Sequence, residues 1–262
     1  MVILALVLLG LCFGSFVNAL VWRLRENKNW VSERSVCTHC GHTLAPIDLI
    51  PVFSWLLLRG KCRYCSQKIE DSPLVELVTP LLLVGSYLFW PHSFSGLGMV
   101  LFGFWVVFIT GLVALAVYDI HWMLLPNKII YPLLVVGLAQ AITIVIWEGG
   151  IDSIIGTALS VLIGGGIFYV LFLISQGRWI GGGDIKLGAL IGLVLGKPEL
   201  SLLMIFVSSL LGSLVALPLL LTGRAKRSTK LPFGPFLIAA CIVVYIFGSS
   251  VIEGYKTQIL GL

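Results

Sequence analysis

Two aspartates, Asp119 and Asp184, stand at the borders of apolar runs and have the side chains best suited to acid–base chemistry. Asp119 follows one long apolar run, and Asp184 closes the sequence Gly181-Gly182-Gly183-Asp184. An ionised carboxylate at membrane depth costs on the order of 3 kcal/mol even on lenient insertion scales, so such residues usually pair, face a wet cavity or do chemistry. Two carboxylates within hydrogen-bond range share a proton, and one then acts as a base toward water while the other acts as an acid toward a carbonyl. The pair therefore predicts aspartic-protease chemistry.

Each aspartate also has a structural interpretation that stays open at this point. Because the three glycines disfavour regular helix, Asp184 would cap a helix that begins at Ile185, and Asp119 would be a polar residue at the membrane border. Other hydrolytic motifs are absent from the sequence: neither HExxH nor GxSxG occurs, and of the four histidines only His121 is near a membrane-border carboxylate. A serine or zinc peptidase is therefore not expected.

Four of the six cysteines form a second chemical pattern, Cys37-x-x-Cys40 followed after 21 residues by Cys62-x-x-Cys65. Paired CxxC motifs at this spacing are typical of a tetrathiolate zinc site. A disulfide interpretation is weaker, because the loop is assigned below to the reducing cytoplasm. The zinc is expected to be structural, since a soluble stretch of about fifty residues with little core needs such a staple.

The composition shows which kind of fold must position these residues. The chain has 262 residues, 58% of them hydrophobic and 11% charged, with a mean hydropathy of +1.06. These values exclude an ordinary soluble domain and predict an all-α polytopic membrane protein. About eight transmembrane helices are expected, most of them near the 20 residues that a span requires, while the sixth has only twelve residues and is expected to be a short crossing helix. The segments are Val2–Trp22, Leu74–Trp90, Leu97–Tyr118, Ile129–Trp147, Ser153–Ser175, Ile185–Gly196, Leu200–Leu221 and Phe233–Ile252.

The positions of the basic residues predict the orientation, because loops rich in Lys and Arg stay in the cytoplasm. With the N-terminus outside, 15 of the 17 Lys and Arg residues fall inside, and both aspartates face the cytoplasm. The net charge of +5 then reflects topology, and no nucleic-acid partner is expected. We expect three parts: a first transmembrane helix at 1–22, a cytoplasmic zinc module between helices 1 and 2 at 23–72, and a seven-helix membrane domain at 73–262.

Several sequence motifs together resemble the bacterial type IV prepilin peptidase family, the bifunctional leader peptidases and N-methyltransferases of pilus, type II secretion and competence systems. The resemblance covers most of the chain. Its motifs are Gly14-Ser15-Phe16-Val17-Asn18, the segments 34–42, 50–56 and 59–65 around the cysteines, Pro73-Leu74-Val75-Glu76-Leu77, the Asp119 motif, Gly181-Gly182-Gly183-Asp184-Ile185-Lys186-Leu187 and Leu231-Pro232-Phe233-Gly234-Pro235-Phe236.

The resemblance implies a GxGD-type intramembrane aspartic endopeptidase in the bacterial inner membrane, with Asp119 and Asp184 as the catalytic pair. Its substrates would be type IV prepilins and pseudopilins in the lipid bilayer, cleaved on the cytoplasmic side. Members with the cysteine loop also methylate the new N-terminus with S-adenosylmethionine. Gly181, Gly182, Gly183 and Lys186 would support the catalytic loop.

Two polar residues are weaker candidates for contact with the substrate or for methyl transfer. Glu76 also suits the start of a helix, where the helix dipole favours an acid, and Asn18 lies near the end of the first helix. The chain departs from the family pattern at Asn127, where an acidic residue is frequent. The alternatives are a transporter whose aspartates relay protons and a membrane component that binds pilin-like helices without cutting them.

Overall fold

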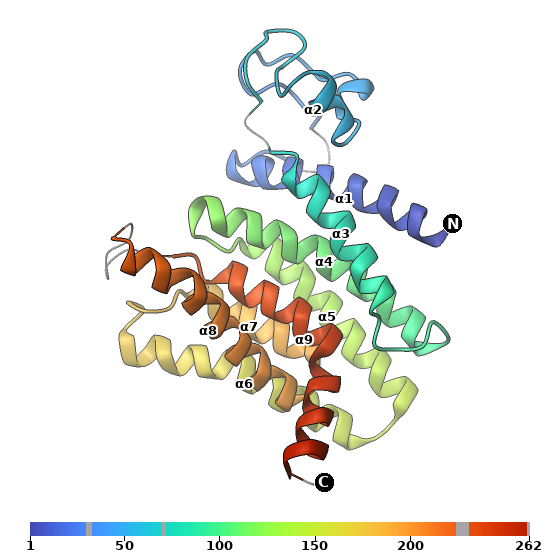
Figure 1. Ribbon diagram of the computed structural model, residues 1–262, viewed down its shortest axis with the longest axis vertical. Coiled ribbons are helices and arrows are strands. Elements are labelled where there is room, and N and C mark those ends of the chain that lie inside the picture. Colours follow the sequence, from blue (N-terminus) through green and yellow to red (C-terminus); the bar gives the residue numbers. More distant parts are fainter. Residues whose placement is uncertain (30–32, 70–71, 224–230, 261–262) are drawn as a thin grey trace. The chain divides into compact units, whose positions relative to one another are not determined.

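A computed structural model describes residues 1–29, 33–69, 72–223 and 231–260, which fold into two compact units, Met1–Phe89 and Trp90–Leu262 (Figure 1). The basic cluster Arg224, Lys226, Arg227 and Lys230, used above for the orientation, lies outside the described residues. The first unit contains α1 (Val2–Arg25), η1 (Pro46–Leu49), α2 (Phe53–Leu57) and α3 (Leu74–Leu88). The second contains α4 (Leu97–Trp122), α5 (Asn127–Glu148), α6 (Ile151–Ser175), α7 (Gly182–Leu195), α8 (Pro198–Leu221), α9 (Gly234–Tyr255) and the terminal turn η2 (Lys256–Leu260).

The all-α prediction is confirmed. Within the described residues there is no β-strand, and two isolated bridges, Val36–Thr43 and Lys61–Lys68, are the only β pairing. All eight predicted apolar segments are helices. Six of the described helices are long and apolar enough to cross a bilayer, namely α1, α4, α5, α6, α8 and α9, whereas α3 has 15 residues and α7 has 14. At 1.5 Å per residue α7 is about 21 Å long, which is shorter than the hydrocarbon core.

In the first unit, α1 and α3 pack closely because two glycines of α1 face α3. A Cβ atom on Gly10 would overlap the backbone of Pro80, and one on Gly14 would lie 2.6 Å from Glu76 Cα. The spacing of these glycines is the GxxxG pattern that lets helix backbones approach one another in membranes. The contact at Gly14 holds the first turn of α3 against α1, so Glu76 lies directly beside α1.

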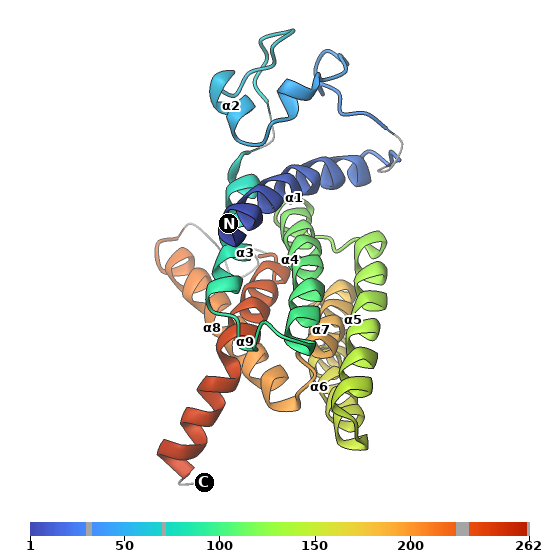
Figure 2. The same cartoon turned by 90° about the vertical axis from the view of Figure 1, so that its right-hand side faces the viewer.

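In the second unit, α7 is the central helix: it contacts α5, α6, α8 and α9, as Figures 1 and 2 show. The closest contact is with α6, because a Cβ on Gly188 would overlap the carbonyl oxygen of Gly164 and one on Gly192 would overlap that of Ser160. Gly196 ends α7 in the left-handed conformation, with φ +65°. Gly188 and Gly192 thus form a small-residue contact with α6, while Gly196 terminates the helix.

The outer surfaces of the long helices carry large apolar side chains. On α8 they recur at about one helical turn, and α5 shows a similar exposed row. In water such continuous apolar surface would favour aggregation, whereas in lipid it is the expected outer face. The exposed residues include Val135, Leu138, Ile142 and Ile146 on α5 and Leu202, Phe206, Leu210, Leu214 and Leu217 on α8.

Candidate active site and metal centre

Asp119 lies in the last turn of α4, and its carboxylate meets the first turn of α9. The residue is 5% exposed, and its Oδ2 accepts a 3.1 Å hydrogen bond from the backbone N–H of Gly234. A Cβ atom on Gly234 would lie 2.6 Å from the same oxygen, so glycine is required for this approach. Gly234 opens α9, and the N-terminus of a helix favours a negative group through its unpaired N–H donors and its dipole.

Asp184 lies in the first turn of α7, which begins at Gly182 rather than at the predicted Ile185. Its Oδ2 accepts a 3.2 Å hydrogen bond from the backbone N–H of Gly181. The expectation that the three glycines stay outside the helix was therefore wrong for Gly182 and Gly183. Asp184 is the third residue of the helix, and its side chain bonds back to the backbone N–H of Gly181, the N-cap, as the acid of a capping box does. Asp184 is therefore not itself the N-cap residue, contrary to the expectation from the sequence.

The two aspartates come together at one end of the second unit through Leu125, which lies in the connection between α4 and α5. A Cβ on Gly183 would lie 3.0 Å from Leu125 Cβ, and one on Gly234 would lie 3.5 Å from Leu125 Cδ2. The glycine beside Asp184 and the glycine bonded to Asp119 thus pack on the same side chain. The two aspartates therefore lie at the same end of the unit, where an approach of their carboxyl groups within hydrogen-bond range would let them share a proton.

Lys186 is directed toward the beginning of α5. Its Nζ donates a 2.8 Å hydrogen bond to Asn127 Oδ1, approaches the hydroxyl of Tyr131 at 3.5 Å and lies 5.4 Å from the centre of that ring. The amide of Asn127 therefore accepts from Lys186 at the position where the family pattern often has an acid. In this geometry Lys186 joins α7 to α5 beside the aspartates.

The four cysteines of the first unit form a compact cluster. The sulfur atoms of Cys37, Cys40, Cys62 and Cys65 all lie within 4.8 Å of one another, and the Sγ atoms of Cys37 and Cys65 are 3.8 Å apart. A tetrahedral zinc ion with Zn–S bonds of about 2.3 Å requires sulfur atoms about 3.8 Å apart. The cluster could therefore bind a metal ion, as predicted, and its dimensions fit zinc.

Two loops of the same geometry build this cluster, and they are 25 residues apart in the sequence. Cys37 N donates to His42 O at 2.9 Å, and Cys62 N donates to Gln67 O at 2.8 Å. The bridges Val36–Thr43 and Lys61–Lys68 close the two loops in the same way. Each loop offers two sulfurs on one face, which explains why the CxxC motif occurs twice.

The ionisation of the thiols also fits a metal site. Burial opposes ionisation of Cys37, but hydrogen bonds from the backbone and from neighbouring thiols lower its pKa to about 6. At Cys65 a backbone hydrogen bond favours the thiolate, yet burial and the neighbouring sulfur atoms raise the pKa to about 12. Without a cation the cluster holds some of its protons, whereas a bound divalent ion deprotonates coordinating thiols.

A polar network around Asp48 connects η1 to the second cysteine loop. The carboxylate is 4% exposed and accepts hydrogen bonds from Arg63 Nε at 2.7 Å, Tyr64 OH at 3.1 Å and Ala45 N at 3.2 Å. Burial raises the pKa of Asp48, but these donors and the charge of Arg63 outweigh it, so the pKa lies below its usual value. The sequence had not indicated this network.

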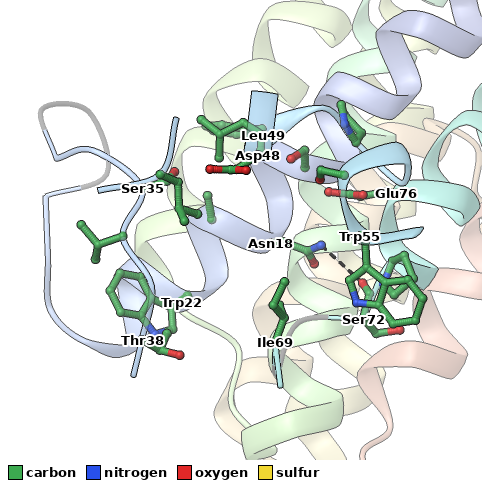
Figure 3. A pocket seen from close by; sticks show the side chains of 18 of the residues that line it. Asn18, Trp22, Ser35, Thr38, Asp48, Leu49, Trp55, Ile69, Ser72 and Glu76 are labelled. Atoms are coloured by element: carbon green, nitrogen blue, oxygen red, sulfur yellow. Dashed lines mark hydrogen bonds between the residues drawn. The ribbon is translucent and has the colours of Figure 1, made fainter. Parts of the chain in front are cut away.

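Asn18 and Glu76, the two weaker candidates, line one cavity of about 470 Å³ in the first unit (Figure 3). Its walls come from α1, from the segment between Asp48 and Trp55, and from the first turn of α3. Asn18 Nδ2 lies 3.5 Å from the carbonyl oxygen of Ser72, and Glu76 Oε2 accepts a 2.6 Å hydrogen bond from Val52 N. The cavity thus brings together residues that are distant in sequence.

Three residues that shape these sites had no predicted role. Gly234 and Leu125 complete the surroundings of the aspartates, and Val52 holds a conformation with φ +61° above the cavity. Gly234 belongs to a motif that carried the family resemblance, so that motif was the available signal for it. Val52 also lies in a motif that carried the resemblance, at 50–56, whereas nothing in the sequence around Leu125 marks it, because its role depends on contacts between distant segments.

The fold and the sites define a class: an all-helical multi-pass membrane protein with paired aspartates at one end of a helical unit and a four-cysteine module in a separate unit. Residues 8–90 match the Bacterial Peptidase A24 N-terminal domain, and residues 106–217 match the Type IV leader peptidase family. The chain belongs to the type IV prepilin peptidase family. The first match ends next to the border between the two structural units.

Three relatives illustrate the similarity, and each is named prepilin leader peptidase/N-methyltransferase. The protein of Bacillus subtilis is 37% identical over 98% of both chains. Those of Aeromonas hydrophila and Pseudomonas aeruginosa are each 32% identical over 97% of this chain and 93% of the relative. The resemblance inferred from the motifs is thus confirmed. The comparison with solved structures gave no match.

Proposed function

We propose that this protein cleaves the leader peptide of type IV prepilins and pseudopilins and then methylates the new N-terminus. The observation that supports the peptidase part is the packing of Gly183 and Gly234 on Leu125, with Asp184 next to the first glycine and Asp119 bonded to the second. The names of the relatives support both activities. A proton-relaying transporter is not favoured, because it accounts for neither the cysteine module nor the family.

In the peptidase reaction the two carboxyl groups share one proton. The ionised carboxylate takes a proton from water, and the water oxygen attacks the carbonyl carbon of the scissile bond. The protonated carboxyl group gives its proton to the carbonyl oxygen. When the resulting diol collapses, the C–N bond breaks and the leaving nitrogen takes up a proton. The N–H groups of Gly181 and Gly234 each hold one carboxylate oxygen, which fixes the orientation of both side chains.

Methyl transfer takes place on the amine that cleavage releases. When bound, S-adenosylmethionine supplies a methyl group whose bond to sulfur breaks with both electrons remaining on sulfur. The amine nitrogen of the cleaved product forms the new bond and releases its proton to solvent. Because that product keeps its apolar helix in the bilayer, it stays near the protein for the second step.

We propose zinc as the ion of the four-cysteine module at 23–72, held by Cys37, Cys40, Cys62 and Cys65 as a structural centre. Four thiolates complete a tetrahedral shell and leave no position for substrate. Metal analysis of the purified protein should give one zinc per chain. A preparation that folds and contains no metal would contradict this assignment.

The orientation in the bacterial inner membrane is also part of the proposal. The described cysteines form no disulfide, which suits a module exposed to the reducing cytoplasm. The distribution of basic residues along the sequence favours the same side for the module and the aspartates. A thiol-reactive label that cannot cross membranes should reach Arg59→Cys, in the module, only after the cytoplasmic face is opened. Labelling of that variant in intact cells would contradict this orientation.

The peptidase assignment is tested with a prepilin in detergent. Asp119→Asn and Asp184→Asn should each lower the cleavage rate by at least about 1,000-fold, because neither variant can pass the shared proton. The matched control is Asp152→Asn, an exposed acid at the start of α6, which should cleave normally. Cleavage that survives either of the first two changes would overturn the catalytic assignment.

The methyltransferase assignment has its own readout. Transfer of labelled methyl groups from S-adenosylmethionine to a cleaved pilin should fail when Cys37 and Cys40 become Ser. It should continue in Asp184→Asn when the pilin is supplied already cleaved. Labelling that persists in the cysteine variant would show that the module is dispensable for methyl transfer.

A further inference from the structure

The cavity that contains Asn18 and Glu76 lies in a part of the first unit that the peptidase reaction does not use. Its volume of about 470 Å³ is within the range of small-molecule sites. It follows α1 from Cys12 to Arg23, a length of about 16 Å at 1.5 Å per residue. A cavity of this shape suits an elongated molecule with chemically different ends.

The two ends of the cavity differ in chemistry. Figure 3 shows the indole of Trp22 at one end, near Thr38 and Ser35, and the carboxylate of Glu76 at the other end, near Trp55. Asn18 lies between them. An indole face binds a cation, as Trp22 does with Lys28 Nζ 4.5 Å from its ring centre, or a purine ring by stacking, and a carboxylate binds a cationic group.

Glu76 is held in place by features that a helix-starting acid does not need. Gly14 lets the backbone at Glu76 approach α1, so that the side chain stands on the cavity wall. One carboxylate oxygen binds Val52 N at 2.6 Å, and Val52 has φ +61°. A β-branched residue in this conformation is strained by about 1–3 kcal/mol, and such strain gathers at functional sites.

We propose that this cavity binds the methyl donor, with its adenine ring against Trp22 and its cationic sulfonium toward Glu76. The proposal rests on the proposed methyltransferase function and adds the location and the orientation of the donor. The smaller hollow of about 100 Å³ beside it is lined by Cys37 and Cys62 and shares Trp22 and Asp48 with the cavity. The metal cluster therefore supports the wall of the donor site.

The test is the binding of two unreactive analogues to the full-length protein in detergent, measured by calorimetry. S-adenosylhomocysteine is neutral at sulfur, whereas sinefungin carries an ammonium group in place of the sulfonium. Glu76→Gln keeps an oxygen for Val52 N and removes the charge. This variant should lower the affinity for sinefungin by at least about tenfold and the affinity for S-adenosylhomocysteine by less than about threefold.

Trp22→Ala should weaken both analogues alike, by about tenfold or more, because stacking does not depend on the charge at sulfur. Trp22→Phe should recover most of the affinity. The matched controls are Trp147→Ala and Glu148→Gln, two exposed residues at the end of α5, and both should bind like the wild type. The zinc content of each variant reports whether its module is folded. If Trp22→Ala does not fold, the affinity of Trp22→Phe for the two analogues tests the role of the ring.

Two results separate failure of this proposal from failure of the proposed function. If the wild type transfers labelled methyl groups and binds both analogues, but Glu76→Gln and Trp22→Ala bind them unchanged, the donor lies elsewhere and methyl transfer stands. If the wild type binds neither analogue and transfers no label, the methyltransferase function itself is wrong. A Glu76→Gln variant that weakens both analogues equally would overturn the orientation.

Discussion

The four-cysteine module and the helical unit of α4–α9 are stabilised by different interactions. Within the described residues 33–69, Cys62 is the only hydrophobic side chain that is buried, and the hydrogen bonds converge on Asp48 and on the cysteine loops. The helical unit instead buries large side chains such as Trp105 and Phe108 and brings α6 and α7 into backbone contact through glycines. The metal ion proposed for the first region would take the place of a hydrophobic core there, so the two regions should unfold under different treatments.

Removal of the metal should produce the largest difference between the two regions. Binding of structural zinc is worth about 10–16 kcal/mol in small zinc modules, far more than the module's few buried side chains supply. A strong chelator, or Cys37→Ser with Cys40→Ser, should abolish hydrogen-exchange protection at 36–43 and 61–68. Protection in α4–α9 should stay unchanged.

The control for this experiment is Cys241→Ser, because Cys241 is buried in α9 and belongs to no metal-ligand cluster among the residues that the structure describes. It should retain full zinc content. If chelation removed protection in both regions equally, the stability of the helical unit would also depend on the metal.

Substitution in the contact between α6 and α7 should destabilise the helical unit and leave the four-cysteine module unchanged. A Cβ on Gly192 would overlap the carbonyl oxygen of Ser160, so Gly192→Ala forces the helices apart and should cost about 1–3 kcal/mol. The melting temperature of the detergent-solubilised protein should fall by several degrees, while the zinc content stays constant.

Gly103→Ala is the matched control for Gly192→Ala. Gly103 lies within α4, and nothing lies within 4 Å of the position of an added Cβ. Its melting temperature should be equal to or above that of the wild type, because alanine favours helix over glycine. An equal fall in melting temperature in both variants would mean that the close packing of α6 on α7 does not contribute to stability.

Asp48→Asn should weaken the module by about 1.5–3 kcal/mol, since the hydrogen bonds of a buried carboxylate to Arg63 and Tyr64 are lost or weakened. The folded-state pKa of Asp48 is lowered, so its contribution is complete above the ordinary pKa near 4 and is lost as the pH falls through the lowered value. The rate of zinc release to a chelator measures the effect.

At neutral pH the variant should release zinc faster than the wild type, and the two rates should converge as the pH falls below about 4. A rate difference that stayed constant down to the lowest pH would show that the charge of Asp48 does not stabilise the module.

The smallest effect should come from the two corresponding turns of the cysteine loops. Gly41 has φ +70°, and Ser66 has φ +58° at the same position of the second loop. Gly41→Ala adds a Cβ in a left-handed conformation and should cost about 1 kcal/mol, whereas Ser66→Ala leaves the backbone strain unchanged. Hydrogen exchange at 36–43 and 61–68 should detect the first change and miss the second.

The sequence predicted most of the fold because the helices follow from local composition. All eight apolar segments are helices within a few residues of their predicted limits, although α4 continues past Asp119 to Trp122 and α7 begins at Gly182. The second difference has a physical cause: the bond from Gly181 N to Asp184 stabilises a first turn that glycines alone disfavour.

The sites were predicted less completely, because their surroundings come from distant segments. Residue type and motif singled out Asp119 and Asp184 as candidates, but they gave no sign of the bond from Gly234, which joins residues 115 positions apart. Asn18 and Glu76 were separate candidates, and only the packing of α1 on α3 places them in one cavity. A local pattern carries no information about such contacts.

The repeated cysteine loop has a consequence for synthesis of the chain. Each loop supplies two of the four sulfurs, so neither half alone can surround an ion. The module therefore closes only after Cys65 has left the ribosome, when α1 has already been made. A metal ion that needs all four sulfurs would then join the two loops only when both are present.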